Sequence, residues 1–274
     1  MSIRLLSHLR IKSSASAALA LVMLACVAAP RAAAEEFRIE TRVYVDDEPK
    51  PVSETTTLFL DGVVYDFLAE PAQVAVFRKP GGGRLGRFIL LDPSHEIRTE
   101  LSTDQLAGAM GKLRAWAAQQ TDPFLKFAAN PQFNESYDEQ SGRLTLASLT
   151  ETYEVDTAKT DHPVAQAEYQ EFLDWYTRLN TLLSAGPPPQ PRLQLNAALA
   201  RHNVIPLKVK LTRAGEDQSI RAEHEFTWRL SRQDMNRIDN VRESLASYRD
   251  VSNDEFLASM RPTGVPSQRP AERR

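Results

Sequence analysis

Apolar and polar side chains alternate along residues 37–45 with the period of two that a half-buried β-strand requires. Residues 55–60 form a second expected strand. Asp61-Gly62 follows directly and predicts a hairpin, because a type I′ turn needs a positive φ at both central residues. Short turn segments separate the further strands that we expect, at 63–68, 73–79, 87–92 and 96–101. Six strands joined so closely predict an antiparallel meander, since parallel pairs need long crossovers.

The hairpin turn also predicts which side chains share one face of the sheet. Its register pairs Leu60 with Val63, Leu58 with Tyr65, and Thr56 with Phe67. The opposite face of these two strands carries Thr57 and Asp66 together with apolar side chains. We expect the first face to point inward, because it is the more apolar of the two.

Beyond residue 101 the apolar positions change to helical spacing. A cap-forming Ser102-Thr103-Asp104 precedes apolar residues that repeat every three or four positions up to Ala117. A cleaner stripe predicts a long helix over 163–184, which begins at Pro163 and is ended by Gly186 and three prolines. The other expected helices are 122–129, 192–201 and 233–248, and the other expected strands are 133–137, 143–149, 151–157 and 207–211.

Residues 220–230 show the longest strict alternation in the chain. His224, Phe226 and Trp228 fall on its apolar face, so we expect this face in a core and the charged face in water. The helices lie between groups of strands, which is typical of an α+β fold. The expected fold is therefore a curled antiparallel β-sheet, or half-barrel, covered by amphipathic helices. Where such helices leave room, an apolar cavity remains, which is the usual form of a small-molecule site.

Residues 1–34 have the layout of a secretory signal peptide. Three basic residues precede an uncharged apolar run at 15–29, and Ala32-Ala33-Ala34 offers a cleavage site. The run is shorter than the about 20 apolar residues of a membrane span. These features predict export, to the periplasm or cell envelope. Lipid anchoring through Cys26, the single cysteine, is the alternative, because the residues before it resemble a bacterial lipobox.

The formal net charge of −3 conceals three unlike regions. Residues 1–34 and 261–274 are basic, whereas residues 35–260 carry a net charge of −10. Such an acidic body argues against nucleic acid as a partner, because phosphate contacts need clustered Lys and Arg. The predicted organisation is a signal peptide at 1–34, a single α+β domain at 35–260 and a disordered basic tail at 261–274.

The order of these segments resembles a known superfamily. The export signal, the hairpin Leu58-Phe59-Leu60-Asp61-Gly62-Val63-Val64-Tyr65-Asp66-Phe67 and the segment from Phe88 to Ser102 are together similar to the LolA-type half-barrel superfamily of periplasmic lipoprotein carriers. The resemblance is one of pattern over residues 36–230. It implies a curved antiparallel sheet closed by helices over an apolar cavity, and binding of lipid or acyl chains. A membrane or lipoprotein partner is also implied.

The sequence offers few candidates for catalysis. The histidines after residue 34 are widely spaced, without a metal-binding pair, and we predict no catalytic, cofactor-binding or metal-binding residue. Asp92, Ser94 and His95 are adjacent in one turn and do not indicate a catalytic triad, which is assembled in space around an oxyanion hole. Two alternatives stay open: an envelope hydrolase that uses scattered acids and His224, and a surface interaction module.

The leading hypothesis is an exported, non-enzymatic protein that binds an apolar or lipid-like ligand in the concave face of its sheet. We expect the ligand to contact large apolar side chains of the sheet, without any cofactor. The candidate ligand-binding residues are Leu58, Tyr65, Phe67, Phe226 and Trp228.

Overall fold

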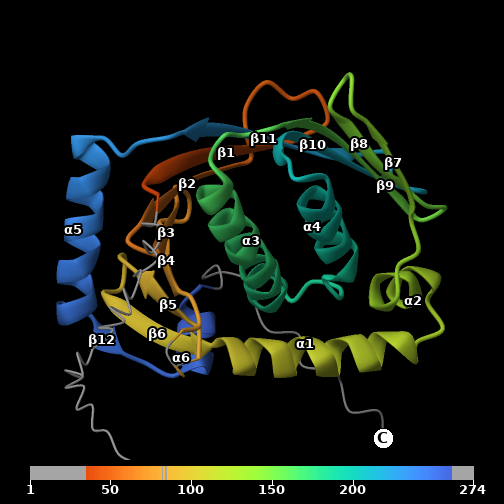
Figure 1. The fold of residues 1–274 in the computed structure, drawn as a ribbon. Coiled ribbons are helices and arrows are strands. Elements are labelled where there is room, and N and C mark those ends of the chain that lie inside the picture. Colours follow the sequence, from red (N-terminus) through yellow and green to blue (C-terminus); the bar gives the residue numbers. More distant parts are fainter. Residues whose placement is uncertain (1–34, 82, 84, 261–274) are drawn as a thin grey trace, which may run out of the picture. The chain divides into compact units, whose positions relative to one another are not determined.

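The computed structural model describes residues 35–260 except 82 and 84. The predicted signal peptide at 1–34, with Cys26, and the predicted tail at 261–274 lie outside the described residues. The described part is a single curved, unclosed sheet of 12 strands with six helices (Figure 1). This architecture confirms the predicted α+β half-barrel.

Two meanders meet edge to edge in the sheet. The strand order is β12-β6-β5-β4-β3-β2-β1-β11-β10-β9-β8-β7, and every neighbouring pair is antiparallel except β12 with β6. The strands are β1 (Phe37–Val45), β2 (Ser53–Leu60), β3 (Val63–Leu68), β4 (Gln73–Arg78), β5 (Arg87–Asp92), β6 (Ile97–Ser102), β7 (Asn134–Asp138), β8 (Arg143–Ala147), β9 (Glu151–Ala158), β10 (Ile205–Arg213), β11 (Ser219–Thr227) and β12 (Arg249–Asp250). The helices are α1 (Thr103–Ala118), α2 (Pro123–Ala129), α3 (Pro163–Leu183), α4 (Gln190–His202), α5 (Arg232–Ser247) and α6 (Asn253–Ser259).

The register of the first hairpin is the predicted one. Leu60 pairs with Val63, Leu58 with Tyr65, and Thr56 with Phe67. Asp61 and Gly62 both have positive φ, at 52° and 71°, as the type I′ turn requires. The structure adds two elements that the pattern did not predict, the two-residue strand β12 and the short helix α6, which Ser252 caps.

Both faces of strands β2 to β5 are covered. Helices α3 and α4 lie within the curve of the sheet, whereas α5 lies outside it (Figure 1). Phe59 and Phe77 pack with α3 on the concave face, and Leu58 and Tyr65 pack with Ile238 of α5 on the convex face. The expectation that the Leu58 face looks into the concave side is therefore wrong. The apolar stripe of α5, which lies much later in the sequence, packs on that face instead.

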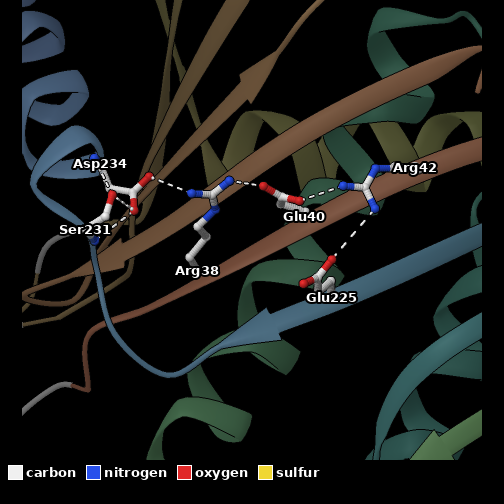
Figure 2. A network of polar contacts seen from close by, with 6 residues as sticks. All are labelled: Arg38, Glu40, Arg42, Glu225, Ser231 and Asp234. Atoms are coloured by element: carbon white, nitrogen blue, oxygen red, sulfur yellow. Dashed lines mark hydrogen bonds and ion pairs between the residues drawn. The ribbon is translucent and has the colours of Figure 1, made fainter.

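A polar chain ties the first turn of α5 to the outer face of the sheet (Figure 2). Ser231 and Asp234 form a reciprocal capping box, and the Asp234 carboxylate lies 3.3 Å from the Arg38 guanidinium. Glu40 bridges Arg38 and Arg42 along β1, and Arg42 reaches Glu225 of β11. The Arg38–Asp234 contact therefore links α5 to β1 on the convex face, where the apolar side of α5 packs.

Helix α4 covers the second meander from inside the curve. Leu195, Ala198 and Leu199 of α4 pack on Leu144 and Val155 of strands β8 and β9. Helix α3 lies beside α4 and covers the first meander (Figure 1). Within the described residues, no helix is both long and apolar enough to cross a membrane.

Candidate functional site: a cavity under helix α3

The main cavity, with a volume of about 570 Å³, lies between α3 and the concave face of the sheet. Ile39 and Val43 of β1 and Ala222 of β11 form its floor, and Phe172 and Leu173 of α3 form its roof. Its volume falls in the range of about 300–1,000 Å³ that is usual for small-molecule sites.

Because of this cavity, the inward side chains of strand β11 are less buried than those of a packed core. Its inward side chains, including Ala222 and His224, are only half-buried, although they face the concave side. The expectation that this face packs in a core is therefore only partly right, because a cavity rather than side chains lies over part of it. The strand also ends at Thr227, earlier than its alternation predicted.

The link between α3 and α4 forms part of the wall of the main cavity. Helix α3 ends at Leu183, and Pro187, Pro188 and Pro189 line the cavity before α4 begins at Gln190. This proline run cannot continue a helix, so the chain turns there. The turn places Arg192, in the first turn of α4, in the cavity wall.

His224 is a perturbed titratable group in the cavity wall. Its Nδ1 lies 2.9 Å from the Thr41 hydroxyl of the neighbouring strand, to which it is paired in register. Its Nε2 is buried and has no hydrogen-bond partner among the described residues. Burial, aided by the positive charge of Arg192, lowers the pKa of His224 to about 3. The ring is therefore neutral at physiological pH.

Tyr169 lies on the α3 side of the same region. It is 4% exposed, and its hydroxyl has no hydrogen-bond partner among the residues that the structure describes. Its ring packs edge-on against Phe226 and Phe59. Burial raises the pKa of Tyr169 above the ordinary value, while the charge of Arg192 opposes that change. The hydroxyl therefore keeps its proton and can donate a hydrogen bond.

The acid Glu151 is compensated within the cavity wall. Its carboxylate is 3.4 Å from the Arg213 guanidinium. Burial raises the pKa of Glu151, and the charge of Arg213 works against this change. One carboxylate oxygen of Glu151 has no hydrogen-bond partner within the described part of the chain.

A second polar cluster divides the main cavity from a smaller one. The Asp66 carboxylate accepts a hydrogen bond from Thr57 at 2.6 Å and another from the Tyr176 hydroxyl. Burial raises the pKa of Asp66, and the two hydrogen bonds oppose that change. Asp66 and Tyr176 line both the main cavity and a second cavity of about 320 Å³, whose walls include Leu90, Leu179 and Phe256 of β5, α3 and α6. The two cavities therefore adjoin at this cluster.

A third cavity, of about 560 Å³, lies at the other end of α3. His162, just before α3, and Trp228, just after β11, stack there with ring centroids 4.2 Å apart. His224 lines both this cavity and the main one. The main cavity and the third cavity therefore adjoin at His224.

The five candidate ligand-binding residues divide between two faces. Phe226 and Trp228 line the third cavity, in contact with Phe37 and Tyr169. Leu58, Tyr65 and Phe67 lie instead on the convex face, in the cluster that α5 covers, and do not line any of the three cavities. Their placement in the concave face is corrected by the structure: one face of β2 and β3 packs on α5, and the other faces the cavities.

The sequence pattern did not single out the polar residues of the main cavity. These are Thr41, Asp66, Tyr169, Tyr176 and Arg192. The sequence did contain a signal for three of them. Tyr169 and Tyr176 are polar-tipped residues in the apolar stripe of the 163–184 helix, and Asp66 is a charged residue between Val64 and Leu68 on one face of its strand. No local pattern marks Arg192, because its position depends on how the α3–α4 link folds.

His95 and His202 each pair with a carboxylate. His95 bonds to Asp92 at 2.6 Å in an exposed turn, and Ser259 also donates to Asp92, so the histidine does not lie between acid and hydroxyl as in a triad. His202 bonds to Glu135 at 2.8 Å, next to the ion pair between Arg201 and Glu135.

The geometry around His224 does not favour the hydrolase alternative. The ring contacts the Thr41 hydroxyl, but it makes no hydrogen bond to a carboxylate of the described residues. A base with a pKa near 3 is also poorly matched to proton abstraction near neutral pH. Within residues 35–81, 83 and 85–260, no group of three or more His, Cys, Asp or Glu side chains is placed to hold a metal ion.

Comparison with known proteins gives no independent lead: no family model matches the chain, and no curated protein matches it.

Proposed function

We propose that the protein binds an apolar or lipid-like small molecule in the main cavity and catalyses no reaction on it. The observation that carries the proposal is the cavity of about 570 Å³ between α3 and the concave face of the sheet. Most of its wall is apolar, and interiors of proteins otherwise leave few voids larger than a water molecule. Burial of each ligand methylene in such a cavity contributes about 0.8 kcal/mol.

The resemblance to periplasmic lipoprotein carriers, together with the segment 1–34, supports an exported protein of the periplasm or cell envelope. A membrane or a lipoprotein is the source from which such a protein would take its ligand. The proposal includes no nucleic-acid partner, because residues 35–260 are acidic.

The test is equilibrium binding of a fluorescent fatty acid to purified, delipidated protein. We expect saturable binding at one site. The variant Val43→Trp places an indole in the cavity floor and should weaken binding at least about tenfold, which corresponds to about 1.4 kcal/mol. Tyr44→Trp is the matched control, since Tyr44 is the next residue of β1, points to the opposite face and packs under Arg221.

Circular dichroism and thermal denaturation establish that both variants are folded before they are compared. Absence of saturable binding by the wild-type protein contradicts the proposal. Equal affinities of Val43→Trp and the wild type would place the ligand elsewhere on the molecule.

A further inference from the structure

One end of the main cavity carries an uncompensated positive charge. Arg192 is half-buried, lines the cavity and forms no ion pair with an acidic residue of the described chain. It lies in the first turn of α4, whose N-terminus has no side-chain cap. The free backbone N–H groups and the positive end of the helix dipole add to the charge of the guanidinium. This end of the cavity therefore attracts an anion.

Two buried polar atoms without partners lie within range of the Arg192 charge. They are the Tyr169 hydroxyl and Nε2 of His224, which line the same cavity. The charge of Arg192 lowers the pKa of both groups, against burial for Tyr169 and together with burial for His224. Buried polar groups are rarely left without a partner, because desolvation costs about 1–3 kcal/mol for each. The two atoms indicate a polar ligand group at this place.

The cavity lining contains one cation without an acidic partner. Glu151 is paired with Arg213, which also contacts the exposed Glu216, and Asp66 accepts hydrogen bonds from Thr57 and Tyr176. Of the two arginines in the lining, Arg192 is the one that no acidic side chain of the described residues pairs. A carboxylate matches one guanidinium in charge and in its paired oxygens, whereas a dianionic phosphate would bring a second charge without a partner.

We propose that the ligand is a long-chain monocarboxylic acid whose carboxylate binds Arg192, the Tyr169 hydroxyl and Nε2–H of His224. In this arrangement the Thr41 hydroxyl donates to Nδ1 of His224, so that the proton of the ring lies on Nε2. The inference rests on the proposed function, since it names the head group of the ligand of the same cavity.

The acyl chain has an apolar path away from this head-group site. It extends between Val43 on the floor and Phe172 on the roof toward the Tyr176–Asp66 cluster. Beyond that cluster the second cavity continues along α3 past Leu179. A linear chain fits a passage of this form better than a bulky ring system does, because the passage follows one helix.

The experiment compares oleic acid with oleyl alcohol, which has the same chain and an uncharged head. Both are titrated into delipidated protein by displacement of the fluorescent fatty acid. The wild type should bind the acid more tightly than the alcohol by about tenfold to a hundredfold, as expected for hydrogen bonds to a charged group.

Arg192→Met keeps an unbranched side chain of similar reach and removes the charge. It should remove most of the preference for the acid and leave the affinity for the alcohol within about twofold. Arg201→Met is the matched control, because Arg201 lies on the same helix, is exposed and pairs with Glu135 outside the cavity. Tyr169→Phe, which keeps the ring packed on Phe59 and Phe226, should reduce the preference for the acid by about three- to tenfold. If Arg192→Met does not fold, the preference of Tyr169→Phe for the acid over the alcohol serves as the test of the carboxylate site.

The outcomes separate the two proposals. Equal binding of acid and alcohol by the wild type, or equal losses of both in Arg192→Met, would overturn the carboxylate site and leave the lipid-binding cavity in place. If neither compound binds the wild type, the proposed function and this inference both fail. Preference for the acid that Arg192→Met and Tyr169→Phe reduce, and that Arg201→Met keeps, supports the inference.

Discussion

The neutral state of His224 makes folding stability depend on pH in a defined window. The native pKa of His224 is lowered to about 3, from an ordinary value of 6.5 that the unfolded chain retains. Between these values the unfolded state binds one more proton than the folded state, so stability falls as the pH decreases below about 6.5. The cause is first the burial of the ring and second the charge of Arg192.

The magnitude follows from the linkage relation. Each pH unit below the unfolded pKa is worth about 1.4 kcal/mol, so lowering the pH from 7 to 5 removes about 2 kcal/mol of stability through His224 alone. With a native pKa of about 3, the folded ring stays neutral at pH 5, so the loss comes from protonation of the unfolded chain.

The assay is urea denaturation of the ligand-free protein at pH 7 and pH 5. Carboxylates contribute to the change in stability as well, so the wild type is compared with His224→Gln, which has no imidazole. The wild type should lose about 2 kcal/mol more than the variant between the two pH values. In Thr41→Val, which loses the hydroxyl beside Nδ1 but keeps the buried ring, the excess loss should persist, because burial and not this hydrogen bond is the main cause.

Equal losses in the wild type and His224→Gln would refute this reasoning. The ring would then be hydrated in the folded state, and the main cavity would be open to water at His224.

Two further predictions concern helix α5. Leu58→Ala removes a fully buried side chain beneath this helix and should lower the free energy of unfolding by about 2–5 kcal/mol. The fatty-acid affinity of the folded protein should stay within about twofold. A large loss of affinity at unchanged stability would instead indicate that Leu58 contacts the ligand. Ser231→Ala removes one half of the capping box shown in Figure 2 and should cost about 1 kcal/mol in urea denaturation. An unchanged urea midpoint in Ser231→Ala would show that the Arg38–Asp234 contact fixes α5 without the cap.

Sequence patterns determined most of the elements and the first meander of this protein. The Asp61-Gly62 turn set the register of β2 and β3, since a type I′ turn matches the twist of the paired strands. The 163–184 stripe likewise predicted α3 closely, because a long run of regular spacing is a strong local signal. Short elements such as β12 and α6 were missed, since two to seven residues carry little periodicity.

The tertiary structure alone decided which face of each strand meets the cavity. In β2 and β3 both faces are apolar enough for burial, and alternation gives two faces without saying which helix covers each. The choice was made by α5, which lies more than 160 residues after β3 and covers the Leu58 face. In the same way, Arg192, Tyr169 and His224 come from three separate elements and meet only because α3 and α4 pack inside the curve of the sheet. Local sequence therefore determined most strands and helices and the pairing within the first meander, whereas long-range packing joined β1 to β11 and created the cavity and its polar end.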